Sequence, residues 1–209
     1  MSLLGRTSRA GALVAVAVAF TAATAVAQVK AHGAAVAGEG PGIRIREVTG
    51  VGPRALVRTP EYSSSISRGR VAARNWAEIT VVFDAELDWT DELTFQYYVL
   101  CYDKVKDKHT LFKGSATYVE VARGKGHMSA MYLRPATLAR YGEVAGVAVE
   151  AVVQGNVVAT DTIGRQGKGG PLPAEWWKIY KDEIKEGALL NRNQTPFAFV
   201  NVDDYETLK

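Results

Sequence analysis

The sequence predicts an all-β fold, an immunoglobulin-like antiparallel β-sandwich. Three features indicate it: apolar and polar side chains alternate in many short runs, turn residues recur about every ten residues, and helical spacing is confined to a few short stretches. With 209 residues, of which 47% are hydrophobic, the chain can bury a core of its own. A β-barrel gives the same alternation and remains the competing topology.

Residues 1–27 are predicted to be a signal peptide. Two arginines precede an uninterrupted run of small and apolar residues, which ends in the small-x-small pattern Ala-Val-Ala just before Gln28. An uncleaved membrane anchor is the alternative, but alanine dominates the run and no basic cluster follows it. We therefore expect export to the periplasm, the outer membrane or the cell surface of a Gram-negative-type bacterium.

Charge and cysteine content narrow the class of protein. The 25 basic side chains are nearly balanced by 22 acidic ones, and no Lys/Arg stripe indicates a nucleic-acid partner. Cys101 is the only cysteine, so the chain has no internal disulfide and depends on a packed core. This favours a bacterial envelope protein over a small disulfide-stapled module. Cys101 is expected to be a buried apolar residue; a reactive thiol is the alternative.

The folded domain is expected to span residues 43–209, after a flexible glycine-rich leader at 28–42. "IRIREV", from Ile43, has the period of a half-buried strand. "RALVRTP" predicts a short edge strand that stops at Pro60, and the serine-rich stretch after it predicts a polar loop.

Two long apolar stretches form the centre of the predicted sheets. "NWAEITVVFD" and "ELTFQYYVLCY" are expected strands, with "ELDWTD" as the turn between them. The second stretch becomes apolar on both faces, which predicts a central strand covered on both sides. After the charged turn "DKVKDK", Gly114 interrupts a β-rich run and predicts a bulge or a switch between sheets. "GKG" predicts the next turn and "HMSAMYL" the returning strand.

The remaining elements have stronger local signals. Pro135 and Gly142 bracket a predicted helical turn, and two Val/Ala runs around Gln154-Gly155-Asn156 predict a hairpin. A linker then leads to a helix expected at about 174–186, on which Trp177, Tyr180 and Ile184 form one apolar stripe. "TPFAFV", at about 195–200, is the expected closing strand, with both phenylalanines on one face.

No catalytic or metal-binding pattern emerges. The three histidines, His32, His109 and His127, lack the spacing of a zinc site. The carboxylates between Asp84 and Glu92 predict a solvated acidic turn, with a calcium loop as the alternative, since the ordered glycine and terminal glutamate of an EF-hand are missing. There is no nucleophile elbow and no phosphate-binding loop. We expect no catalytic residue, metal or cofactor, and hence a protein that is not an enzyme.

The aromatic side chains are the candidate binding residues. Tyr98, Tyr102, Trp176 and Trp177 could stack on a sugar, which would make the protein a carbohydrate-binding or adhesive module. The alternative is packing, in which the tryptophan pair covers the outer face of the central strand. Exposed coplanar rings would favour the first hypothesis and buried rings the second.

Four stretches carry a resemblance to a known family. They are "WAEITVVFDAELDWTDELTFQYYVLC", "TYVEVARGKGHMSAMYLRPATLARYG", "VAVEAVVQGNVVATD" and the ending "WW … LLNRNQTPFAFV", which together cover Ile43 to Val200. The chain resembles a family of exported pilus-like proteins from Verrucomicrobia with an immunoglobulin-like fold, encoded beside type IV pilus-like assembly components. The resemblance implies a non-catalytic envelope protein, structural or protein-binding, whose partners are other proteins of a pilus-like or secretion assembly at or near the outer membrane.

Overall fold

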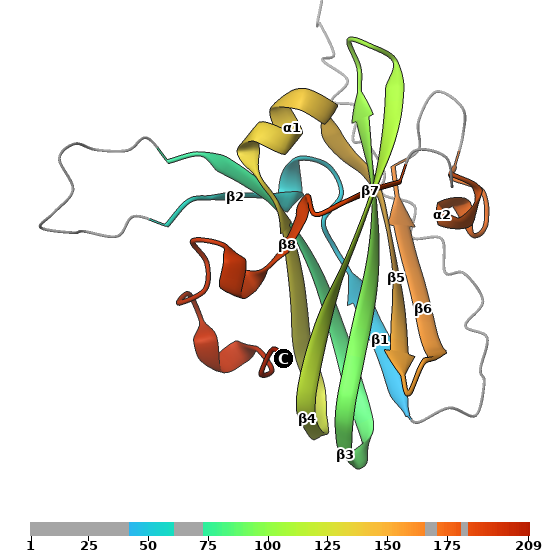
Figure 1. Ribbon diagram of the computed structural model, residues 1–209, viewed down its shortest axis with the longest axis vertical. Helices are drawn as coiled ribbons and strands as arrows, with labels where there is room; N and C mark the ends of the chain where they lie inside the picture. Colours follow the sequence, from blue (N-terminus) through green and yellow to red (C-terminus); the bar gives the residue numbers. More distant parts are fainter. Residues whose placement is uncertain (1–41, 61–72, 166–170, 181–183) are drawn as a thin grey trace, which may run out of the picture.

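The computed structural model describes residues 42–60, 73–165, 171–180 and 184–209, and these residues form an all-β protein (Figure 1). Eight strands belong to one sheet, which folds back on itself, and two short α-helices flank it. The predicted all-β sandwich is confirmed. The expected signal peptide (1–27), nearly all of the leader and the predicted serine-rich loop lie outside the described residues.

One long hairpin dominates the structure. Strands β3 (Asn75–Asp103) and β4 (Lys108–Leu133) pair antiparallel from Ala77↔Leu133 to Asp103↔Lys108. In Figure 1 both strands reach the bottom of the molecule and turn upward again, so that each contributes to both halves of the fold. We call this lower end the bend.

The predicted turns "ELDWTD" and "GKG" are wrong, because both segments belong to β3 and β4. At the bend the pair Ala85↔Gly124 is followed by Trp89↔Ala122, so residues 86–88 lie opposite Arg123 alone. Such a bulge lets a strand change direction without ending its ladder of hydrogen bonds. The Arg123 Nε atom donates to the Glu86 carbonyl at 2.7 Å and holds the longer side of the bulge in place.

The other strands extend each half of this hairpin. Strands β1 (Ile43–Val48) and β2 (Leu56–Arg58) pair with the first half of β3, and β8 (Leu189–Asn191) pairs with the end of β4. A 3₁₀ helix, η1 (Gly52–Ala55), lies between β1 and β2. The second half of β3 pairs with β5 (Glu143–Val153), which pairs with β6 (Asn156–Gly164). The predicted hairpin is confirmed, and its turn residues Gln154 and Gly155 both have positive φ, 50° and 80°.

The core lies between the two halves. Side chains that are fully shielded from solvent come from both: Ile79, Val81 and Phe83 from the first half of β3, and Phe95, Tyr97, Val99 and Cys101 from the second. The hydroxyls of Tyr97 and Tyr118, in the second half, both bond the Ser129 hydroxyl in the first. Burial raises the pKa of the Cys101 thiol to about 12, as expected for an inert apolar cysteine.

The helices agree with the sequence only in part. Helix α1 (Pro135–Tyr141) ends at Gly142, whose φ of 85° suits glycine, as predicted. Helix α2 (Trp176–Ile179) is much shorter than the expected helix at 174–186. Residues 184–186 instead form strand β7 (Ile184–Glu186), which pairs with β4 in parallel orientation. The segment is extended because the open edge of β4 provides hydrogen-bond partners for its backbone groups.

The closing strand is β8, not residues 195–200. The Asn191 side chain and Gln194 form a capping box that starts a 3₁₀ helix, η3 (Arg192–Gln194), and thereby ends the strand. Residues 195–200 form turns, in which Phe197 is buried and Phe199 is 82% exposed, so the two rings do not share a face. A last 3₁₀ helix, η4 (Val202–Asp204), precedes a bridge between Leu208 and Tyr118.

The bulge predicted at Gly114 is also wrong, because the pair Tyr97↔Gly114 lies in regular register. A Cβ atom at Gly114 would lie 2.7 Å from the Leu189 Cβ atom and 3.0 Å from the Met131 Cε atom. The glycine therefore permits the close approach of β8 to the core.

Candidate functional site

Three of the four predicted binding residues lie together, but the tryptophans are buried. Trp176 and Trp177 are 1% and 5% exposed and pack on Leu100, Leu111 and Ala148. Their rings are nearly perpendicular, at 85°, and each indole N–H donates a 3.0 Å hydrogen bond, to the Thr162 hydroxyl and the Glu150 carboxylate respectively. The pair covers the outer face of the second half of the sheet, as the packing alternative predicted.

Tyr98 is half-buried beside Trp177, with ring centroids 6.4 Å apart. Its hydroxyl donates to Gln96 at 3.1 Å and to Glu150 at 3.2 Å. Burial, followed by the Glu150 charge, raises the pKa of Tyr98 to about 12, so this phenol is a neutral donor at physiological pH.

Tyr102 lies apart from these rings, near the turn that joins β3 and β4. It stacks on His109 with centroids 4.7 Å apart and donates a 2.6 Å hydrogen bond to Asp107. That hydrogen bond, more than burial, raises the pKa of Tyr102. The four predicted residues therefore form no single flat surface.

A cavity with a strongly basic lining lies at this turn, the upper end of the molecule in Figure 1. It has a volume of about 440 Å³, within the range of ligand cavities, and lies between the turn, α1 and β7. Four cationic side chains and one carboxylate are among the residues that line it: Asp103, Lys106, Lys108, Thr110, Arg140, Tyr141, Ile184 and Lys185. We call it the basic cavity.

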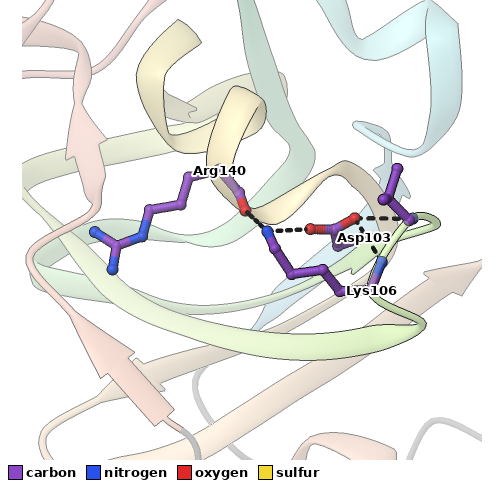
Figure 2. Close-up of polar contacts among 4 residues, drawn as sticks. Asp103, Lys106 and Arg140 are labelled. Carbon is purple, nitrogen blue, oxygen red and sulfur yellow. Dashed lines mark hydrogen bonds and ion pairs between the residues drawn. The ribbon is translucent and has the colours of Figure 1, made fainter.

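Hydrogen bonds in the turn fix one wall of the basic cavity (Figure 2). The Asp103 carboxylate accepts from the backbone N–H groups of Val105 at 2.9 Å and Lys106 at 3.2 Å. The Lys106 ammonium lies 2.7 Å from the same carboxylate and also reaches the Arg140 carbonyl at the end of α1, at 3.4 Å. The Lys106 side chain is the main reason that the pKa of Asp103 is lowered, so this carboxylate stays ionised.

Arg140 and Lys185 are the cations available for a ligand. Figure 2 shows the Arg140 guanidinium extending away from the Asp103–Lys106 pair. The Arg140 guanidinium carbon lies 5.2 Å, and the Lys185 ammonium 5.9 Å, from the centre of the Tyr141 ring. Neither cation forms an ion pair with any residue in the described part of the chain. Together with Tyr141 they can hold an anionic or aromatic group.

The bend, at the opposite end of the molecule, exposes two apolar side chains. Leu87 is 42% and Trp89 65% exposed. Around them lie the carboxylates that were predicted to form a solvated acidic turn, and Asp88 pairs with Arg123 at 3.3 Å. Within the described ranges, no group of three or more His, Cys, Asp or Glu side chains is placed to hold a metal ion. Two of the histidines have other contacts: His109 stacks on Tyr102, and His127 bonds Glu206.

Neither end of the molecule was predicted from the sequence to be a site. The lone tryptophan within a run of carboxylates was a usable signal, since a solvated turn needs no indole. The basic cavity was harder to find, because Lys185 reaches it from β7, where a helix was expected. None of the helices in the described part of the chain has the length and apolar character that a membrane crossing needs.

Comparison with known proteins places these features in a family. A protein-family model matches residues 47–209, which include every strand from β2 onward. No curated protein matches the chain. A crystal structure of a protein from Akkermansia muciniphila superposes with a TM-score of 0.65 at 22% sequence identity, covering 84% of this chain and 97% of that one. At this identity the likeness shows a shared fold.

Proposed function

This chain belongs to the family whose model matches residues 47–209, and on that premise we propose that it is an exported, non-catalytic envelope protein. Its proposed role is structural or protein-binding, within a type IV pilus-like or secretion assembly in the periplasm, at the outer membrane or at the cell surface. The pilus-like role and the immunoglobulin-like character of the sandwich are what the sequence resemblance implies, and a fold shared with a protein of a Verrucomicrobium supports them.

The exposed ring of Trp89 is the observation that carries the protein-binding role. Tryptophan is the residue most enriched at the energetic centres of protein interfaces, and an indole that is 65% exposed beside Leu87 leaves apolar surface in water. The bend that presents it is held by paired strands and by the Arg123–Glu86 hydrogen bond, so little ordering is needed on binding.

The burial of the two tryptophan rings argues against the glycan-binding alternative. Trp176 and Trp177, which it needs on the surface, are enclosed and perpendicular to each other. Tyr98 and Tyr102 are separated and engaged in hydrogen bonds with carboxylates. These observations favour protein contact.

An affinity pull-down from native envelopes tests the proposal. The tagged protein starting at Gln28 should recover pilus-like assembly proteins, identified by mass spectrometry, and Trp89→Ala should lose them. Val157→Ala is the matched control, since Val157 is 56% exposed and lies on β6, away from the bend. Recovery of sugar-polymer fragments without assembly proteins would support the glycan-binding alternative instead.

A further inference from the structure

The two ends of the molecule differ in charge and in the groups they expose. Figure 1 places the bend at the bottom of the long axis and the turn between β3 and β4 at the top. The bend carries a protruding indole among carboxylates, and the turn carries a cavity among cations. Because the two ends carry different surfaces, the bend of one copy can bind the turn of a second copy of the same chain.

The bend is acidic as well as apolar. Residues 84–92 contain five carboxylates and no cation, and Glu120 adds a sixth on the facing strand: Asp84, Glu86, Asp88, Asp91, Glu92 and Glu120. Arg123 and Lys125 are the cations on the facing strand at the bend. Arg46 and Lys209 each pair with one of the six, Asp84 and Glu92, at 3.4 Å and 2.5 Å. Arg44 lies opposite Asp84 on β1, so six carboxylates face five cations, an excess of one negative charge, with Trp89 exposed among them.

The basic cavity offers the matching chemistry. A cation is attracted to the face of an indole more strongly than to any other aromatic side chain. Arg140 and Lys185 both line the cavity, from two different elements, α1 and β7. The Tyr141 ring beside them is fixed by an edge-on contact with Phe112, with centroids 5.2 Å apart. Lys104, on the same turn, pairs with Glu143 at 2.7 Å, so Arg140 and Lys185 carry the charge that faces a partner.

We propose that copies of this chain associate head to tail, with Trp89 of one copy inserted into the basic cavity of the next. The indole lies against Tyr141 between Arg140 and Lys185, and the carboxylates around Trp89 face the cations of the turn. This inference rests on the proposed function, because it names a second copy as one of the partners in the assembly.

The geometry favours an open chain over a symmetric dimer. Two bends facing each other would bring carboxylates together, and two cavities would bring cations together, so each like pairing is repulsive. The contact joins two different surfaces at opposite ends of the molecule, so every added copy leaves one end of each kind free. The product is a linear oligomer.

Two variants that each block one end provide the test by sedimentation velocity. Trp89→Ala removes the inserted ring, and Arg140→Glu with Lys185→Glu reverses the charge of the cavity; all three residues are exposed. We expect the mean mass of the wild type to rise with concentration, over about a hundredfold range, and each variant alone to remain monomeric. An equimolar mixture of the two should form dimers and nothing larger, since it contains one intact pair of surfaces.

Two further measurements test whether the contact depends on the aromatic ring and on electrostatic attraction. Trp89→Phe retains a ring and should associate more tightly than Trp89→Ala, while Val157→Ala should behave as wild type. Raising the ionic strength from about 0.1 M to about 1 M shortens the screening length from about 10 Å to about 3 Å and should dissociate the oligomers. Circular dichroism of each variant confirms that it is folded.

A wild type that stays monomeric at every concentration, or a mixture that forms no dimer, would overturn the head-to-tail contact. Failure here is separable from failure of the proposed function. If the purified chain is monomeric but still recovers assembly proteins through Trp89, the inference fails and the proposed function stands. If the chain oligomerises as expected but recovers no assembly protein, the head-to-tail contact is supported and the proposed role in a pilus-like or secretion assembly is not.

Discussion

The rings of Phe83 and Phe95 lie 4.9 Å apart although both belong to strand β3. They meet because the strand turns back at the bend between them, where residues 86–88 lie opposite Arg123 alone. A single hydrogen-bonded hairpin thus supplies both walls of the core. The two walls cannot come apart without breaking either the bend or the packing across it.

Alanine at Phe83 or at Phe95 should each lower the free energy of unfolding by about 3–5 kcal/mol, as for other buried phenylalanines. Because the rings touch, the double variant should differ from the sum of the two by about 0.5 kcal/mol or more. Urea denaturation of the four proteins in this cycle measures both quantities. Additive effects would show that the rings contribute independently and that the bend does not couple the two walls.

Ser129 should be the most sensitive polar position of the core. Its hydroxyl is fully buried and bonds the hydroxyls of both Tyr97 and Tyr118. Alanine there leaves two buried phenols without this partner, and we expect a loss of about 1–3 kcal/mol in the free energy of unfolding. Partial recovery of stability on adding Tyr97→Phe to Ser129→Ala would confirm the cause, since one of the two orphaned hydroxyls is then absent. No recovery in the double variant would contradict it.

The sequence predicted the fold class because period-two alternation depends on local chemistry. Strand β1 shows the alternation directly, and the β5–β6 hairpin and helix α1 have their turn and cap residues in the sequence, at Gln154-Gly155 and at Pro135 and Gly142. The bend has no such local mark. It depends on the register of two strands against each other, and polar residues at a bulge look the same as polar residues at a turn.

The C-terminal elements were misread for a related reason. The spacing of Trp177, Tyr180 and Ile184 fits a helix, and all three do pack in one cluster. The open edge of β4 nevertheless draws Ile184 into a strand. Hydrogen bonding to β4 outweighs the helical spacing of these residues. This strand pairing also sets the position of Lys185, which lines the basic cavity. The cavity could therefore be found only from the three-dimensional structure.

Alkaline pH should destabilise the protein more steeply than usual. Burial raises the pKa of Tyr118 and of Cys101 to about 12 and that of Tyr97 well above its usual value. A group with a raised pKa in the folded state keeps its proton there and loses it on unfolding. Its stabilising effect is therefore complete below the unfolded pKa, about 8.5 for Cys and about 10 for Tyr, and declines as the pH rises toward 12. Urea midpoints measured from pH 8 to pH 12 should fall throughout this window, and a flat profile would show that these groups ionise freely.

Truncation after Gly187 should unfold or nearly unfold the protein. It removes β8 and the buried side chains of Leu189, Leu190 and Phe197, each of which contributes about 1.5–3 kcal/mol by burial. The total is comparable to the whole stability of a domain, about 5–15 kcal/mol. Thermal unfolding of the truncated chain measures it. A truncated protein that kept the thermal midpoint of the full chain would show that β8 does not belong to the cooperative core.

Phe197 and Phe199 should respond very differently to alanine substitution, because the segment that holds them is a series of turns and not a strand. Phe197 packs face to face with Tyr132 at 4.9 Å and edge-on against Trp76 at 5.8 Å. Its removal should cost about 3–5 kcal/mol. Phe199 is 82% exposed, and its removal should change stability by no more than about 0.5 kcal/mol. Equal losses at the two positions would indicate that both rings enter the core, as a closing strand at 195–200 would require.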